Sequence, residues 1–350
     1  MKTFYFILSA CIIFSFCHRP PPDYDPLQEE ISVCRIMFWN AENLFDCFKD
    51  SLCEDSEFLP YGIRGWNNTR YKQKLNKMYK VFIAAGNWEP PDLIGLCEIE
   101  NKNVLFGLLR DTPFSYYAYR FIHFESPDRR GIDVALLYNP KTINVLGEKA
   151  IAVQLSDSPD SRSRDILYVR VKIISGDTLS VFVNHWPSKY GGPGFTADLR
   201  ETVGKILLKS LDSLRTLNPR EKIIVLGDFN DPPESNSLRM LSVAGKEMTL
   251  ENENLLINLS EEYKGSVPGS YKFSGSWQMI DQILVSKNLI SGDGKVCIKP
   301  MSFRVFSPEF ILEKDEKYGG VKPNRTYTGM IYHGGYSDHL PVILDLFEKN

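Results

Sequence analysis

The stretch Ile223-Ile224-Val225-Leu226-Gly227-Asp228-Phe229-Asn230 carries the sharpest pattern in the chain. Its leading aliphatic residues predict a buried strand. Gly227 permits a tight turn and the close approach of a ligand, and the i, i+2 spacing places Asp228 and Asn230 on the same side of an extended chain. We therefore expect two polar side chains held together at the end of a strand. Taken alone, an Asx turn before the Asp-Pro-Pro that follows explains the pattern equally well.

Runs rich in Val, Ile, Tyr and Phe recur along the chain and predict further strands. They lie at 33–39, 92–97, 116–122, 134–138, 167–174, 179–183, 280–285 and 341–346. Apolar residues at three- and four-residue spacing predict helices at 70–85, 195–214 and 235–244. No second linker or internal repeat interrupts this pattern, so one domain over 32–348 is the simplest organisation. Many strands and few helices predict an α+β fold of packed sheets flanked by helices.

Composition places the 350-residue chain among ordinary globular proteins, with 43% hydrophobic and 24% charged residues. Its formal net charge of −3 gives no general basic surface. A polyanionic substrate would therefore need local Lys or Arg side chains or a bound metal, and sequence-specific DNA binding is disfavoured. Cys47 and Cys53 are close enough in a loop-like stretch to form a disulfide in an oxidising compartment.

The N-terminal residues predict export. A basic residue precedes an apolar run over 4–16 that is too short to span a bilayer comfortably, and a Pro-rich spacer follows over 18–31. This layout predicts an export signal over 1–17. Cys11 and Cys17 are both candidate lipid-attachment sites, and we expect lipoprotein processing at Cys17, with plain signal cleavage or an uncleaved anchor as the alternative. The expected location is the periplasm of a bacterium, or its membrane through the N-terminal lipid.

Polar residues follow several predicted strands at the point where the apolar run stops. Asn40, Glu98 and His185 each come directly after such a run. Because strand ends hold side chains on a rigid support at one rim of a sheet, we expect these residues to form a site together. Phosphodiester cleavage needs a metal on the phosphoryl oxygens and an oriented water, and Mg²⁺ or Mn²⁺ prefers oxygen ligands such as Glu98 and Asn40 offer. On its own, Glu98 is better explained as an exposed loop acid.

Two of the five histidines, His185 and His339, lie where a predicted strand ends or begins. Histidine exchanges a proton near neutral pH, and a neighbouring carboxylate supports its charged form. Asp338 is adjacent to His339, but adjacent residues on an extended chain point apart. We therefore expect the partner of His339 to be Asp281, an acid within an apolar run. Taken singly, each histidine is better explained as a hydrogen-bonded structural residue.

The ordered set of motifs resembles the endonuclease/exonuclease/phosphatase superfamily over residues 35–346. The motifs that carry the resemblance are Phe38-Trp39-Asn40-Ala41-Glu42-Asn43-Leu44-Phe45, Glu98, 131–138, Asn184-His185, Gly227-Asp228-Phe229-Asn230, Ile280-Asp281-Gln282-Ile283-Leu284 and Ser337-Asp338-His339. Each is modest alone, but their order is specific. The resemblance implies a DNase I-like fold, in which a two-layer β-sandwich is flanked by helices in four αββα layers and the site lies at one edge.

The resemblance also implies a role for each matching residue. It implies Mg²⁺ (or Mn²⁺) binding by Asn40, Glu98 and Asp338, water orientation and phosphate contact by Asp228 and Asn230, and a carboxylate–histidine couple of Asp281 and His339.

His185 would assist phosphate binding or leaving-group protonation, but Asn184 is adjacent, so either side chain could face the phosphate. A glutamate partner for His185 has no clear match, and Glu125 and Asp128 are the candidates. Arg164 offers a planar donor fork suited to phosphate oxygens, or an ordinary surface ion pair.

An exported nuclease is the function that we expect, acting as a monomer on nucleic acid or another phosphodiester without sequence specificity. Basic residues at 70–74 and Lys189 could meet a phosphate backbone, or could be a solvated surface. A phosphatase or phospholipase C-like enzyme on inositol phosphates or lipid headgroups shares the core motifs and is the main alternative. A non-catalytic binding module is disfavoured because every core position keeps a chemically competent side chain.

Overall fold

The computed structural model describes residues 32–51, 53–156, 163–189, 192–243, 255–292 and 294–349. The expected export signal, spacer and lipidation sites at Cys11 and Cys17 lie outside the described residues. All elements below belong to the unit that runs from Ser32 to Asn350. None of the helices in the described ranges is both long and apolar enough to span a bilayer.

Two large sheets form the centre of this unit, and each contains seven strands within the described ranges. The first sheet has the order β14-β20-β1-β2-β4-β3, with β15 also paired to β20. Its strands are β1 (Cys34–Leu44), β2 (Leu93–Ile99), β3 (Arg120–His123), β4 (Asp133–Tyr138), β14 (Val296–Cys297), β15 (Phe303–Val305) and β20 (Val342–Glu348).

The second sheet has the order β5-β6-β7-β8-β13-β10-β9. Its strands are β5 (Ile143–Ile151), β6 (Ile166–Ile173), β7 (Thr178–His185), β8 (Lys222–Asp228), β9 (Ser242–Val243), β10 (Leu256–Asn258) and β13 (Asp281–Val285). In the part of the chain that the structure describes, three hairpins lie apart from both sheets: β11 (Tyr271–Phe273) with β12 (Ser276–Gln278), β16 (Leu312–Lys314) with β17 (Val321–Pro323), and β18 (Tyr327–Thr328) with β19 (Ile331–Tyr332).

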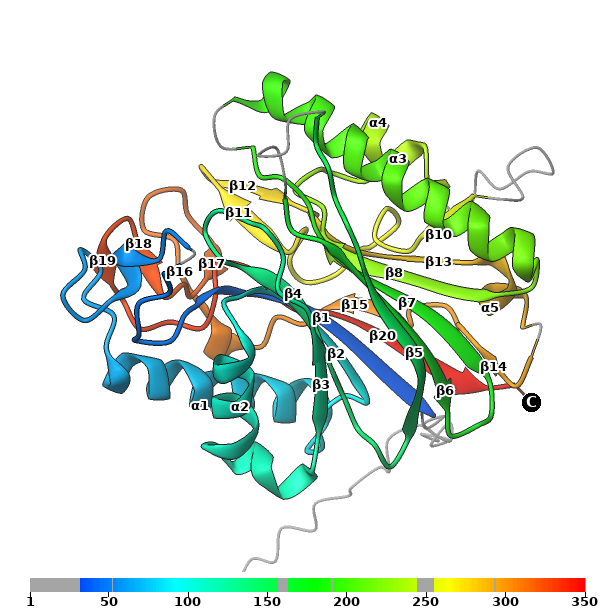
Figure 1. Cartoon of the computed structure of the whole chain (residues 1–350), viewed down its shortest axis with the longest axis horizontal. Coiled ribbons are helices and arrows are strands. Elements are labelled where there is room, and N and C mark those ends of the chain that lie inside the picture. Colours follow the sequence, from blue (N-terminus) through cyan, green and yellow to red (C-terminus); the bar gives the residue numbers. More distant parts are fainter. Residues whose placement is uncertain are drawn as a thin grey trace, which may run out of the picture. The chain divides into compact units, whose positions relative to one another are not determined.

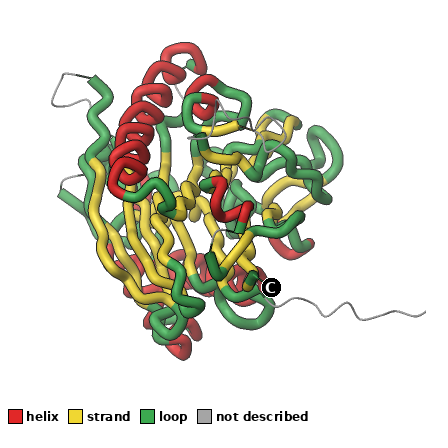
Figure 2. Tube along the Cα trace, turned by 90° about the vertical axis from the view of Figure 1, so that its right-hand side faces the viewer, coloured by secondary structure: helices red, strands yellow, loops and turns green. Residues whose placement is uncertain are grey.

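The sheets pack face to face, and helices cover their outer faces (Figures 1 and 2). On the first sheet lie α1 (Asn68–Ala85) and α2 (Lys102–Arg110), and on the second lie α3 (Pro193–Leu217) and α4 (Asn236–Arg239). The short α5 (Lys287–Ser291) follows β13, and 3-10 turns occupy Ser56–Phe58, Pro113–Tyr117 and Glu309–Ile311. Buried apolar residues of both sheets, such as Phe38, Val183 and Leu226, meet between the sheets around Gly95 and belong to one core. The expected four-layer α+β architecture is confirmed.

Several local predictions differ from the structure. The strand expected over 116–122 begins only at Arg120, because Thr112 caps a 3-10 turn over Pro113–Tyr117 and Ala118 then adopts φ 54°. The helix expected over 235–244 is limited to α4, and Ser242–Val243 forms a strand instead. The edge strand β5 is not anticipated, since its alternating residues are largely exposed. Cys47 and Cys53 are free thiols, so the disulfide considered between them is absent.

Candidate active site

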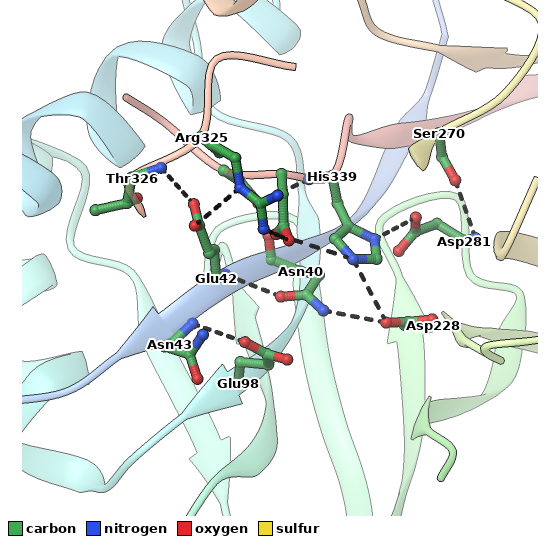
Figure 3. A network of polar contacts seen from close by, with 12 residues as sticks. Asn40, Glu42, Asn43, Glu98, Asp228, Ser270, Asp281, Arg325, Thr326 and His339 are labelled. Carbon is green, nitrogen blue, oxygen red and sulfur yellow. Dashed lines mark hydrogen bonds and ion pairs between the residues drawn. The ribbon is translucent and has the colours of Figure 1, made fainter. Parts of the chain in front are cut away.

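Polar side chains from both sheets meet where β1 and β2 face β8 and β13 (Figure 3). Strand register brings three of them into one row. β7 and β8 are parallel and pair His185 with Asp228, while β8 and β13 are antiparallel and pair Asp228 with Asp281. All three side chains are buried. Residues that are distant in the sequence are therefore side by side on neighbouring strands, as the strand-end pattern predicts for His185 and Asp228.

Asn40 and Glu98 occupy irregular positions inside their strands rather than the strand ends expected. The register between β1 and β2 shifts between Asn40 and Leu44, and that between β2 and β4 shifts on either side of Glu98. Glu98 has φ 59° and Asn43 has φ 52°, in the left-handed region that non-glycine residues rarely adopt. The Asn43 backbone N–H donates to Glu98 Oε2 at 2.8 Å, so the two bulges support each other.

Asp281 and His339 form the couple that the sequence suggests. His339 Nδ1 lies 2.7 Å from Asp281 Oδ2, and the Tyr271 ring packs against the imidazole at a centroid distance of 4.7 Å. The backbone N–H of Asp281 donates to Ser270 Oγ, and that of His339 donates to Ser337 Oγ. These hydrogen bonds fix the orientation of both groups.

The pKa values of both His339 and Asp228 are raised, for different reasons. Burial alone would lower the pKa of His339, but the carboxylates of Asp281 and Asp228 outweigh it and hold the pKa well above its usual value. Burial raises the pKa of Asp228 to about 7, helped by Asp281 and opposed by His339 and by the hydrogen bonds from Asn230 and Asn40. His339 Nε2 and Asp228 Oδ2 are 3.9 Å apart, which is too far for a hydrogen bond. A charged imidazole and a weakly acidic carboxyl therefore face each other.

His185 differs from His339 in its charge state. Its Nε2 lies 3.9 Å from both Glu98 Oε1 and Asp228 Oδ2, and its Nδ1 makes no hydrogen bond within the described ranges. Burial lowers the pKa of His185 well below its usual value, and the cations Arg164 and Arg130 lower it further. The ring is therefore neutral.

The side chains of Asn184 and Arg164 form hydrogen bonds within the protein and have a structural role. Asn184 is fully buried, accepts from Trp186 Nε1 and donates to the Leu226 carbonyl, so His185 rather than Asn184 lies against Asp228. The Arg164 guanidinium donates to the His185 and Trp186 carbonyls and pairs with Asp128 at 2.9 Å. Its donor fork is thus already bound within the protein.

Neither candidate partner reaches the His185 side chain. Asp128 binds Arg164, and Glu125 lies beside His123 instead. The acids nearest to His185 Nε2 are Glu98 and Asp228.

Asn230, the second polar residue of the opening motif, has φ 52°. Its backbone N–H donates to Asp228 Oδ1 at 2.9 Å, and its side chain donates to the Trp186 carbonyl at 3.1 Å. The Asx-type hydrogen bond and a role in the site therefore coexist, because Asn230 holds the Asp228 carboxyl in place.

The donors expected to bind metal suit a hard cation. Asn40, Glu98 and Asp338 all offer oxygen, as Mg²⁺ and Mn²⁺ prefer. Glu98 and Asp338 are only partly buried, and each uses one carboxylate oxygen in a hydrogen bond, from Asn43 and from Arg325. Their other oxygens make no hydrogen bond within the described part of the chain and are available to a cation. Asn40 Nδ2 donates to Asp228 Oδ2 at 3.1 Å, linking this group to the couple.

Two further groupings of donor atoms overlap the site: Cys97 with His185 and Asp228, and Asp228 with Asp281 and His339. Burial raises the pKa of the Cys97 thiol well above its usual value, which disfavours the thiolate that a metal would need. The short His339–Asp281 hydrogen bond already uses the donors of the second group. Both are better assigned to proton transfer and packing than to metal binding.

A buried charged network beside the site goes beyond the residues singled out from sequence. Glu42 accepts from the backbone N–H groups of Thr326 and Tyr327, and Lys74 Nζ lies 4.0 Å from its carboxylate. Arg325 bridges Glu42 and Asp338. Burial raises the pKa of Glu42 to about 7 and lowers that of Lys74 to about 8. Glu42 lies two residues after Asn40 and Lys74 lies within the basic stretch at 70–74, but no sequence signal places either of them in a buried network.

The fold and this site define a phosphoester hydrolase. A model of the endonuclease/exonuclease/phosphatase family matches residues 35–348, so the chain belongs to that family, whose members are phosphoester hydrolases and generally depend on a divalent metal. No curated protein sequence matches the chain.

Solved structures share this fold at low sequence identity. The catalytic domain of human Nocturnin has 15% identity and a TM-score of 0.54, covering 91% of this chain and 96% of its own. The mannosyl-6-phosphatase Bt3783 of Bacteroides thetaiotaomicron has 15% identity and a TM-score of 0.56, with 89% and 99% covered. The TDP2 of D. rerio in complex with a single-strand DNA product has 14% identity and a TM-score of 0.51, with 89% and 98% covered.

Proposed function

We propose that the protein is an exported, divalent-metal-dependent nuclease that cleaves phosphodiesters without sequence specificity. Nucleic acid is favoured as the substrate by an aromatic surface beside His339. The Tyr271 ring packs against the His339 imidazole, and Phe273 lies parallel to Tyr271 at 9° with a centroid distance of 6.5 Å. Phe273 is 60% exposed. A nucleobase attached to a phosphate at His339 could stack on this surface, as single-stranded nucleic acids do on aromatic side chains.

The side chains suit the hydrolysis of a phosphodiester. Asp228, with its pKa raised to about 7, can accept a proton from an attacking water near neutral pH. The charged His339 can donate a hydrogen bond from Nε2 to a phosphoryl oxygen, and neutral His185 can do the same from the other side of Asp228. A divalent cation bound by Glu98, Asn40 and Asp338 would supply Lewis-acid stabilisation of the charge on the phosphoryl oxygens.

Arg70, Lys74 and Lys189, three of the basic residues expected to meet a phosphate backbone, have partners within the protein. Lys74 is buried and donates to Thr326 Oγ1 and the Tyr336 carbonyl. Arg70 donates to the carbonyls of Arg64 and Gly65, and Lys189 lies 4.0 Å from an Asp231 carboxylate oxygen. Metal and aromatic contacts therefore contribute more to the proposed substrate binding than a basic groove does. Export rests on the N-terminal sequence pattern.

A substrate panel tests this proposal. The purified protein is assayed with Mg²⁺ or Mn²⁺ on single-stranded DNA, RNA, plasmid DNA, sphingomyelin, inositol phosphates and a sugar monophosphate. We expect cleavage of nucleic acid that stops on chelation and returns when metal is restored. Turnover of the lipid, inositol or sugar phosphates without cleavage of any nucleic acid would replace the nuclease with the phosphatase or phospholipase alternative, and no hydrolysis at all would favour a binding module.

A further inference from the structure

A second cluster of titratable side chains lies at the loop between β3 and β4. His123 is the last residue of β3, Asp133 is the first residue of β4, and Glu125 belongs to the loop that joins them. The two strands are antiparallel neighbours in the first sheet, so the ends of the loop are close together. None of these residues takes part in the chemistry assigned to Asp228 and His339.

The His123 side chain is fully buried, yet neither of its ring nitrogens makes a hydrogen bond within the described residues. Nε2 lies 3.4 Å from Asp133 Oδ2, and Nδ1 lies 3.7 Å from Glu125 Oε1. Both distances exceed the roughly 2.9 Å of an ordinary N–H···O hydrogen bond. A buried imidazole without hydrogen-bond partners is costly, so the arrangement calls for a further ligand.

The donor atoms around this imidazole converge. One ring nitrogen, one oxygen of Asp133 and one of Glu125 all lie within 4.8 Å of one another. Atoms bound at about 2.1 Å to the same ion are roughly 3 to 3.5 Å apart. Asp133 faces Nε2 and Glu125 faces Nδ1 of the ring, so an ion on Nε2 requires the Glu125 carboxylate to swing toward Asp133. The Glu125 side chain is 60% exposed and can make this movement.

The acid at the centre of the cluster is already oriented. Asp133 Oδ1 accepts hydrogen bonds from both the backbone N–H and the hydroxyl of Ser126. This leaves Oδ2 directed at the imidazole. Hydrogen bonds to the second oxygen of a ligating carboxylate are typical of metal sites, because they fix the ligand before the ion arrives.

We propose that His123, Glu125 and Asp133 bind one divalent transition-metal ion, with water completing its coordination shell. An imidazole nitrogen with two carboxylates suits Zn²⁺, Mn²⁺ or Co²⁺ better than Ca²⁺ or Mg²⁺, which prefer oxygen alone. The site is separate from the oxygen ligands Glu98 and Asp338. It is a structural site, because His123 is fully buried and no substrate group can reach its ring.

The ion would hold the loop that steadies the surroundings of His185. Asp128, from the same loop, pairs with Arg164 at 2.9 Å. Arg164 in turn donates to the backbone carbonyls of His185 and Trp186. Fixing the loop at Glu125 and Asp133 therefore restrains this chain of contacts to the candidate active site.

Zinc binding to the full chain tests the proposal. The protein is stripped with a chelator, returned to excess Mg²⁺ and titrated with Zn²⁺ against a chromophoric chelator. We expect the wild-type protein to bind one Zn²⁺ that His123→Asn loses and that Glu125→Gln holds about 10- to 100-fold more weakly. His339→Asn, the same change at the candidate active site, is the matched control and should retain this ion.

A second measurement guards against misfolding. Zn²⁺ should raise the melting temperature of the wild-type protein and of His339→Asn, but raise that of Glu125→Gln less at the same Zn²⁺ concentration. The mostly exposed Glu125 side chain can change without disturbing the core. If His123→Asn fails to fold, Glu125→Gln decides. Zinc affinity and thermal response equal to wild type in Glu125→Gln, or loss of the ion in His339→Asn alone, would overturn the proposal and leave His123 as a metal-free partner of two acids.

Discussion

The Nδ1 atom of His339 lies 2.7 Å from the Oδ2 atom of Asp281, although 58 residues separate the two in the chain. Asp281 begins β13 in the second sheet, and His339 lies just before β20 in the first. The hydrogen bond therefore joins the two layers of the sandwich. It also stabilises the protonated form of this buried imidazole, whose Nε2 atom faces Asp228.

Substitution of this pair should reduce catalysis in a non-additive way. Asp281→Asn keeps the shape of the side chain but removes the charge that supports the protonated His339, so we expect kcat on an oligonucleotide to fall by about 10²- to 10⁴-fold. The kcat of His339→Gln should fall by a similar factor. The kcat of the double variant should be no lower than that of the less active single variant, because the two groups act as one unit. Steady-state rates with circular dichroism as a folding control provide the test; additive losses would contradict a coupled role.

Glu98→Gln should weaken the use of metal. The substitution removes the charge of a carboxylate that has one oxygen available, so the Mg²⁺ concentration for half-maximal rate should rise at least about tenfold. The measurement is a Mg²⁺ titration of the cleavage rate. Glu57→Gln, which alters a half-exposed acid paired with Arg64, serves as the control and should leave the titration unchanged. An unaltered midpoint in Glu98→Gln would remove Glu98 from the metal site.

Phe273→Ala should weaken the binding of an oligonucleotide but not of a small substrate. Loss of one stacked base costs about 1 to 3 kcal/mol, so KM for single-stranded DNA should rise by roughly 5- to 150-fold. The kcat/KM for a small aryl phosphodiester should stay near wild type. Phe48→Ala, at an even more exposed aromatic position outside the hairpin, is the control. Equal effects on both substrates would argue against a stacking surface.

Asp177 makes the free energy of unfolding depend on pH in the acidic range. Burial acts to raise its pKa, but hydrogen bonds from Lys222 and from the backbone of Val296 and Lys295 outweigh burial and lower it. Because the folded pKa is depressed, this stabilisation is present above the unfolded pKa of about 3.9 and is lost as the pH falls through the folded value.

Asp177→Asn should accordingly lower the free energy of unfolding by roughly 1 to 3 kcal/mol at pH 7 and flatten its decline in acid. Urea unfolding between neutral and acidic pH measures both effects. Asp212→Asn, which removes an exposed acid paired with Arg215, should change the free energy by less than about 0.5 kcal/mol. A wild-type pH slope in Asp177→Asn would show that other carboxyls control the acid response.

The layers of this fold are predictable because strands that are buried on both faces appear in the sequence as continuous apolar runs of strand length. The strands that hold His185 and Asp228 end at those residues, as the sequence indicates. The β5 edge strand and the Pro113–Tyr117 turn escape prediction for physical reasons. An edge strand has little apolar surface to reveal it, and a capped turn rich in aromatic residues resembles a strand.

The sequence identifies most residues of the site, but it does not predict how their side chains are arranged. Asn40 and Glu98 depend on bulges and left-handed backbone that no periodic pattern encodes. Arg164 and Asn184 are polar residues near the site whose donors turn inward, which depends on neighbouring carbonyls rather than on residue type. Arg325 and Lys74 join the network only through tertiary contacts with Glu42. Local sequence carries none of these contacts.

The proposed metal-dependent cleavage of nucleic acid uses Asp228 to accept a proton. Its most direct test is the single-turnover cleavage rate of a labelled single-stranded oligonucleotide by the wild-type protein and by Asp228→Asn, each with Mg²⁺ and with chelator. We predict cleavage by the wild-type protein only with Mg²⁺, and a rate about 10²- to 10⁴-fold lower for Asp228→Asn at an unchanged affinity for the oligonucleotide. Cleavage by Asp228→Asn at the wild-type rate, or cleavage that survives removal of the metal, would contradict the claim.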